Sequence, residues 1–69
     1  MPDHWPTINE QIMEIDREIA LRYRVYPRFV ANGKLKPEKA EWQIRCLKAA
    51  RASLLELKGQ RENAQLAAL

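Results

Sequence analysis

The sequence has few of the residues on which small domains and catalytic sites usually depend. Its 69 residues include one cysteine, Cys46, and one histidine, His4. A single cysteine excludes an intrachain disulfide, and one thiol with one imidazole supplies too few ligands for a structural zinc site. A chain this short buries little apolar surface. We therefore expect association with another chain to complete its core.

The residues of a reactive centre are scarce as well. With only Gly33 and Gly59, the sequence has no glycine-rich phosphate-binding loop. A nucleophile needs a base within hydrogen-bond reach, and His4 lies in a proline-bearing leader. A lone helical cysteine such as Cys46 is most often a small hydrophobic residue. The sequence predicts no enzyme, no catalytic residue, no metal site and no cofactor.

Long apolar runs are also missing. None approaches the roughly 18 residues of a membrane span. The first residues include Asp3, Pro2 and Pro6, unlike the basic and apolar regions of a signal peptide. A lone thiol fits a reducing compartment. These features predict a soluble, cytoplasmic protein with no membrane partner.

The charge that is present is distributed unevenly. The net charge is +3, but residues 1–16 carry four carboxylates and no Lys or Arg, a net charge of −4. Residues 17–36 carry +5, residues 37–51 carry +2 and residues 52–69 carry zero. The chain is bipolar, with its positive charge in the middle of the sequence.

Two stretches have the apolar period of a helix. Thr7 and Glu10 form a capping-box pattern, which predicts that a helix begins at Ile8. Apolar residues then recur at spacings of three and four up to Val30, in the stripe Ile8, Ile12, Ile15, Ile19, Tyr23, Tyr26 and Val30. This stripe predicts helix one over residues 8–31. Pro27 lies inside it, so we expect a bend there. The alternative is a stop near Val25 followed by a separate turn.

A turn and a second helix follow. Asn32 and Gly33 favour a helix end, residues 32–36 read as a turn, and Pro37 suits the first position of a new helix. A near-heptad stripe predicts helix two over residues 37–66, through Ala40, Ile44, Leu47, Ala50, Leu54, Leu57, Arg61 and Ala64.

The two stripes match when the chain folds back at Lys34. Residue i then lies opposite roughly residue 68 − i, which pairs Ile12 with Leu57, Ile15 with Leu54, Ile19 with Ala50 and Tyr26 with Trp42. The fold class is therefore all-α, a single antiparallel helical hairpin over residues 1–69 preceded by an extended leader, residues 1–6. Trp5 in that leader is expected to pack on a helix or on a second chain.

A second apolar line on helix one suggests a further partner. It follows Met13, Leu21 and Val25, with Phe29 beyond them. Two helices alone cannot cover both lines, so we expect a homodimer that forms a four-helix bundle, with Met13, Leu21 and Val25 as its flank.

The hairpin gathers cations and aromatic residues at its turn. We call this group the basic tip; its members are Arg22, Arg24, Tyr26, Arg28, Phe29, Lys34, Lys36, Lys39, Trp42 and Arg45. Such a group can bind an acidic protein surface, or grip phosphates and stack on bases. The simpler interpretation, which we favour, is that the aromatic rings cap the bundle and the arginine stems cover them. Sequence-specific DNA reading is not expected, because a hairpin has no third helix to support a recognition helix.

The middle of the sequence resembles a known group of short proteins. The run from Arg17 to Leu35, REIALRYRVYPRFVANGKL, is followed by Ala40 and Ile44. It is similar to the pattern R-E-I-A-x-R-x-x-V-Y-P-x-x-V-x-x-G-[KR]-[LM], then A-x-x-x-I, of uncharacterised phage and prophage proteins. The similarity covers residues 17–47. It implies a small phage accessory protein, located in the host bacterial cytoplasm, and assigns no functional residue.

These observations predict a non-enzymatic accessory protein that acts through protein–protein contact. Its expected partners are a second copy of itself and a host protein with an acidic surface. The alternative is sequence-independent binding of nucleic acid through the basic tip.

Overall fold

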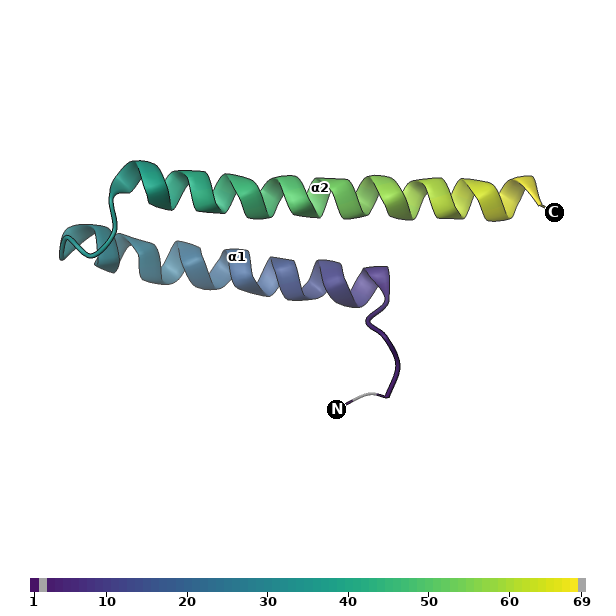
Figure 1. Ribbon diagram of the computed structural model, residues 1–69, viewed down its shortest axis with the longest axis horizontal. Helices are drawn as coiled ribbons and strands as arrows, with labels where there is room; N and C mark the ends of the chain where they lie inside the picture. The colour runs from purple at the N-terminus through teal and green to yellow at the C-terminus, as the bar shows by residue number, and fades with distance from the viewer. Residues whose placement is uncertain (2, 69) are drawn as a thin grey trace.

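The chain forms an antiparallel helical hairpin. The computed structural model describes residue 1 and residues 3–68. In these residues the regular secondary structure consists of α1 (Ile8–Ala31) and α2 (Pro37–Ala67), which lie side by side in opposite directions (Figure 1). The prediction of an all-α hairpin is confirmed. α1 has the bounds expected from its stripe, and α2 ends one residue later than expected.

Side-chain capping fixes the start of α1. The Thr7 hydroxyl accepts a hydrogen bond from the backbone N–H of Glu10 at 3.1 Å, and the Glu10 carboxylate accepts one from the N–H of Thr7 at 3.0 Å. The same carboxylate oxygen lies 2.7 Å from Nε2 of His4. Two N–H groups that a helix start leaves unpaired are thus satisfied, and His4 of the leader is bonded to the first turn of α1.

The turn has the hydrogen bonds of a glycine-terminated helix. The N–H of Lys34 donates to the carbonyl of Phe29 at 2.9 Å, and the N–H of Gly33 donates to that of Val30 at 3.2 Å. Gly33 has a φ of +78°, a conformation that costs little only without a Cβ. α2 begins at Pro37. A proline is tolerated there because the N–H groups of the first turn have no hydrogen-bond partner within the helix, so the missing N–H costs nothing.

Neither Pro27 nor Gly59 interrupts a helix. α1 continues through Pro27 to Ala31, so the alternative of a stop near Val25 is wrong. α2 continues through Gly59 to Ala67. Its last turns therefore extend past the start of α1, as Figure 1 shows at the open end of the hairpin. A bend at Pro27 stays a prediction.

The helices pair close to the expected register. Asp16 bonds to Arg51, with Oδ1 and Nε 2.5 Å apart, and the hydroxyl of Tyr26 bonds to Gln43. Both pairs lie within one residue of the relation i to 68 − i. The pairing of Tyr26 with Trp42 is wrong, because Gln43 occupies that place and Trp42 is 61% exposed.

The buried stripe of α2 differs from the predicted one. Ala50 and Leu57 are exposed, whereas Arg51 and Lys58 are half-buried. The sequence prediction followed a near-heptad spacing, but a helix with 3.6 residues per turn drifts away from a 3.5-residue repeat. The positions facing α1 are therefore Ala40, Ile44, Leu47, Arg51, Leu54 and Lys58, at an average spacing of 3.6 residues.

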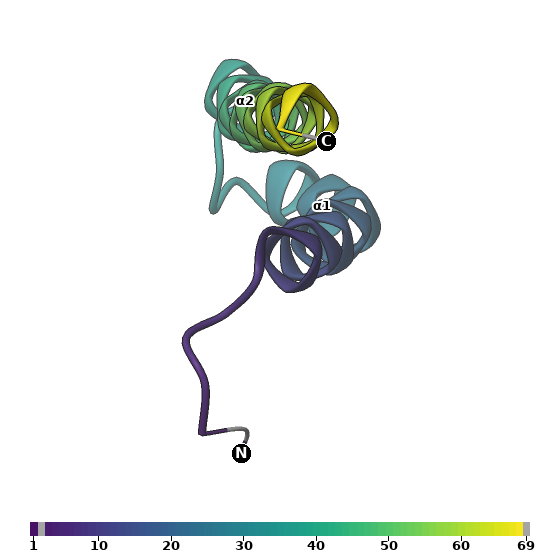
Figure 2. The ribbon, with the colours of Figure 1, turned by 90° about the vertical axis from the view of Figure 1, so that its right-hand side faces the viewer.

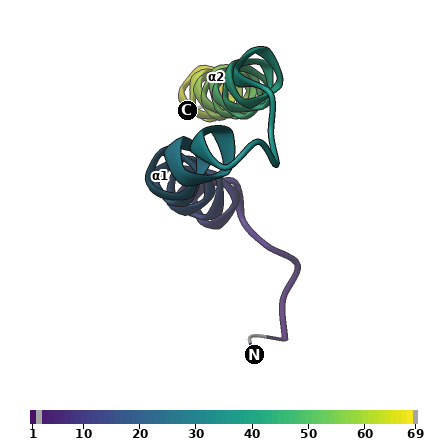
Figure 3. The ribbon, with the colours of Figure 1, turned by 90° about the vertical axis from the view of Figure 1, so that its left-hand side faces the viewer.

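Little of the molecule is buried. Among the residues that the structure describes, only Ile12 and Ala40 are buried. The leader runs away from both helices (Figures 2 and 3), and Trp5 remains 88% exposed. The expectation that Trp5 packs on a helix of its own chain is wrong, so any packing partner must come from outside the hairpin.

Removal of the Thr7 hydroxyl should destabilise the hairpin. Replacing an N-cap threonine by alanine costs about 1 kcal/mol, so Thr7→Ala should lower the free energy of unfolding by about that amount in urea denaturation followed by circular dichroism. Thr7→Ser keeps the hydroxyl and serves as the control. Equal stability of Thr7→Ala and wild type would show that the capping box contributes nothing.

Stability should also fall in acid through Glu10. The hydrogen bonds from Thr7, followed by that from His4, lower the pKa of Glu10 from 4.5 to about 2. A carboxylate whose pKa is lower in the folded chain than in the unfolded chain stabilises the fold at pH values above its unfolded pKa. For Glu10 this stabilisation is lost as the pH falls from 4.5 towards 2. Glu10→Gln should therefore show a smaller drop in melting temperature over this range than wild type. Glu56→Gln, an exposed carboxylate on α2, should keep the full drop.

Candidate interaction surface

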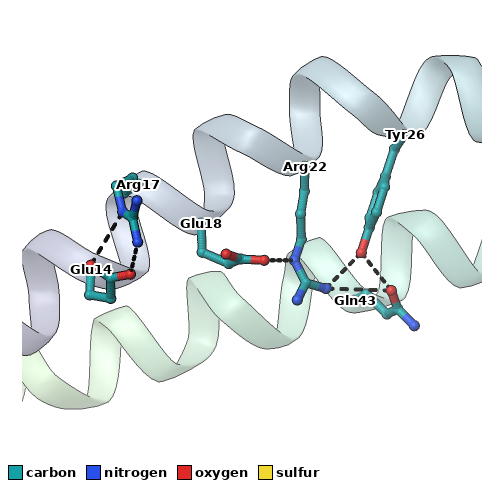
Figure 4. A network of polar contacts seen from close by, with 6 residues as sticks. All are labelled: Glu14, Arg17, Glu18, Arg22, Tyr26 and Gln43. Carbon is teal, nitrogen blue, oxygen red and sulfur yellow. Dashed lines mark hydrogen bonds and ion pairs between the residues drawn. The ribbon is translucent and has the colours of Figure 1, made fainter.

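Two members of the basic tip belong to a network between the helices. Arg22 bonds to Glu18, with Nε and Oε1 2.8 Å apart, and its Nη1 donates to the Tyr26 hydroxyl at 2.6 Å (Figure 4). That hydroxyl donates to Oε1 of Gln43 on α2 at 2.6 Å. The contact with Glu18, followed by that with Tyr26, raises the pKa of Arg22. Arg22 and Tyr26, both half-buried, therefore join the helices to each other.

The remaining cations of the basic tip face solvent. Arg24, Arg28, Lys34, Lys36, Lys39 and Arg45 are all exposed, and within residues 3–68 none of them forms an ion pair. By contrast, Arg17 pairs with Glu14 on the first half of α1 (Figure 4). The half of the hairpin next to the turn, residues 17–51, therefore keeps an excess of positive charge, with a net charge of +7.

Aromatic rings accompany some of these cations. The Arg45 guanidinium lies 6.0 Å from the centre of the Trp42 ring, and Nζ of Lys48 lies 5.3 Å from the centre of the Tyr23 ring. Tyr23, Arg45 and Lys48 line one open groove of about 570 Å³ between α1 and α2. Trp42 and Arg45 lie three residues apart on α2, whereas the hairpin brings Tyr23 of α1 to Lys48 of α2.

The contact of Tyr23 with Lys48 was not predicted from the sequence. Tyr23 belongs to the apolar stripe that should face α2, yet it is 52% exposed. The relation i to 68 − i could have found the pair, since it places residue 45 opposite Tyr23 and Lys48 one turn further on. Phe29, also assigned to the basic tip, is 37% exposed, and its backbone carbonyl accepts the turn hydrogen bonds.

The predicted flank is not one continuous surface. Met13 and Leu21 are 70% and 41% exposed, but Val25 is half-buried. Met13 and Val25 are separated by 12 residues, which at 3.6 residues per turn places them about 120° apart around the helix. Charged side chains also surround Met13 and Leu21 on this outer side of α1, namely Glu10, Glu14, Arg17, Arg24 and Arg28.

A more uniform surface lies on α2. We call it the uncharged α2 face; its members are Trp42, Cys46, Ala49, Ala50, Ser53 and Leu57, all of them exposed. This face was not predicted, because the near-heptad stripe places Ala50 and Leu57 in contact with helix one. The sequence contains the pattern that predicts this face, namely uncharged residues that recur at helical spacing.

The network of Figure 4 gives a direct stability test. Tyr26→Phe removes the hydroxyl that joins Arg22 to Gln43 and should lower the free energy of unfolding by about 1 kcal/mol. Tyr23→Phe is the matched control, because the Tyr23 hydroxyl has no hydrogen bond to the described part of the chain and should be close to neutral. Urea denaturation at one protein concentration measures both. Equal effects would contradict a structural role for the network.

The described residues show no other recognisable chemistry. They contain no cluster of three or more His, Cys, Asp or Glu side chains placed to hold a metal ion. Neither α1 nor α2 is long and apolar enough to cross a membrane. Comparisons with protein-family models, curated proteins and solved structures gave no match.

Proposed function

We propose that this chain is a small non-enzymatic accessory protein, of phage or prophage origin, that functions as a homodimer through protein–protein contact. The observation that carries the proposal is the near absence of a core. Of the residues that the structure describes, only Ile12 and Ala40 are buried, while Trp5, Met13, Trp42 and Leu66 are each more than 60% exposed. Exposure of this kind marks an interaction surface, because burying apolar area is the main gain of association.

The exposed area supports a partner of substantial size. The chain exposes 5931 Å². A folded monomer of its mass, 8.1 kDa, exposes about 4,500 Å². The excess is about 1,400 Å², and each partner in a standard protein–protein interface contributes about 800 Å². A homodimer can therefore cover much of the excess and still leave area for another protein.

The basic tip is the part of the dimer that we assign to that other protein. Its unpaired cations, Arg24, Arg28, Lys34, Lys36, Lys39 and Arg45, complement a surface rich in Asp and Glu. A host protein with such an acidic surface is the proposed target, located with this protein in the host cytoplasm. Complementary charge speeds encounter and selects the partner, while the apolar residues near the turn supply the area.

Nucleic acid is the second candidate. The observation that favours it is the exposed Trp42 ring beside the Arg45 guanidinium, because a ring and an arginine together can stack on a base and hold a phosphate. Such binding would be independent of sequence, since the hairpin offers no supported recognition helix.

One pair of variants tests the role of the tip. Arg24→Ala/Arg28→Ala should lose binding to the acidic partner while keeping the dimer, measured by pull-down and by light scattering after size-exclusion chromatography. Arg17→Ala/Arg61→Ala removes two exposed cations outside the basic tip and should bind like wild type. Equal binding by both double variants would overturn the assignment of the tip.

Salt separates the two candidates. Affinity for a short DNA duplex should fall by orders of magnitude between about 50 and about 200 mM salt if the tip binds phosphates. In that case the variant Arg24→Ala/Arg28→Ala should also bind the DNA duplex more weakly than wild type. A protein complex with a largely apolar interface should weaken far less. A chain that is monomeric at all concentrations would contradict the proposed dimer.

A further inference from the structure

The geometry points to the uncharged α2 face as the surface that holds the second copy, with the two hairpins antiparallel. Each basic tip then lies at the same end of the assembly as the partner's open end. This inference rests on the proposed homodimer and specifies which surfaces meet and in which direction.

The uncharged α2 face has the spacing of a helix-pairing surface. Cys46, Ala50, Ser53 and Leu57 recur at intervals of four, three and four residues. Two helices can pack along such a stripe by inserting side chains of one between those of the other. Since most of these side chains are small, the helices can approach closely. The outer side of α1 is a poorer surface, because an interface there would bury Glu14, Arg17 and Arg24 beside Leu21.

An antiparallel register satisfies the whole stripe at once. In an antiparallel pair, layers form where the two residue numbers have a constant sum. A sum of about 103 places Cys46 against the partner's Leu57 and Ala50 against the partner's Ser53. The same register brings Lys36 level with the partner's Ala67, so the two copies of α2 (Pro37–Ala67) overlap along their full length. One shift therefore aligns the stripe and the helix ends together.

The charge distribution selects the antiparallel direction. In the hairpin, residues 17–51 form the half next to the turn, with a net charge of +7. Residues 1–16 and 52–69 form the open half, with a net charge of −4. Antiparallel pairing places each positive half beside the partner's negative half, whereas parallel pairing places +7 beside +7. Charges within about 10 Å are only partly screened at 0.1 M salt, so the parallel arrangement is disfavoured.

Cys46 allows the direction to be tested with one substitution. In the antiparallel register the two copies of Cys46 are about 16 Å apart along the helix axis, given a rise of 1.5 Å per residue. That separation is too long for a disulfide. Leu57→Cys would place a new thiol beside the partner's Cys46. The pair within one chain is also about 16 Å apart on one helix, so only a bond between chains can form.

The experiment is mild oxidation of purified wild type, Leu57→Cys and Leu55→Cys, followed by non-reducing electrophoresis and peptide mapping. We expect a covalent dimer in Leu57→Cys, joined between residues 46 and 57, and little in the other two. Leu55→Cys is the matched control, because Leu55 is exposed like Leu57 but lies on the opposite edge of α2. A covalent dimer of wild type through Cys46 would exclude the proposed register, in which the two copies of Cys46 are too far apart for a disulfide, and would overturn the inference.

Two further variants test the face without a crosslink. Ala50→Glu would bury an unpaired carboxylate in the interface and should raise the dimer dissociation constant more than about tenfold. Ala52→Glu adds the same charge to an exposed position outside the stripe and should leave the constant unchanged. Sedimentation equilibrium measures both, with circular dichroism to confirm that the helices remain.

The outcomes separate this inference from the proposed function. A wild-type dimer that is insensitive to Ala50→Glu and gives no crosslink in Leu57→Cys would place the interface elsewhere, for example around Met13 and Leu21. The homodimer would then stand and the inference would fall. A wild type that is monomeric throughout would overturn both.

Discussion

Two helices can bury only one side of each other, and most features of this chain follow from that limit. α1 and α2 meet along one stripe each, which is enough to bury Ile12 and Ala40 but leaves both helices with apolar residues on other sides. α2 in particular has apolar residues around most of its circumference, a pattern typical of a helix with neighbours on more than one face. This uncovered apolar area is what supports the proposed association with another chain.

The contacts between the helices are partly polar, and this affects what the tip can do. Arg22, Tyr26 and Gln43 form a chain of hydrogen bonds across the hairpin, and Asp16 pairs with Arg51 about two turns nearer the open end. Exposed ion pairs contribute at most about 1 kcal/mol each, so these contacts fix the register more than they add stability. Because Arg22 and Tyr26 serve this purpose, the binding capacity of the turn end falls to Arg24, Arg28 and the lysines around the turn.

Local signals predicted the helices and the turn well, since each acts within a few residues. The capping box at Thr7 and Glu10, the left-handed Gly33 and Pro37 at the start of α2 all have the geometry that their residue types favour. The prediction was wrong about the faces of α2. Ala50 and Leu57 fit a 3.5-residue repeat. Because the helix has 3.6 residues per turn, these two residues are exposed in the structure, and Arg51 and Lys58 lie on the side that faces α1. The long aliphatic stems of Arg51 and Lys58 can occupy such positions, so polarity alone did not identify them. The solvent exposure of the residues of the basic tip likewise depends on how the two helices pack against each other. Signals that act within a few residues of the sequence do not predict that packing.

The direction of association has a consequence for the basic tip. If the copies pair antiparallel, the dimer carries one tip at each end, separated by roughly the 56 Å length of the hairpin. Two weak contacts on one rigid body can bind a target with repeated acidic surfaces far more tightly than either contact alone. Two tips at the same end would compete for the same space and repel each other. The bipolar charge that favours antiparallel pairing would thus also separate the two binding surfaces, which makes a repeated or elongated acidic target a better match for this protein than a small compact one.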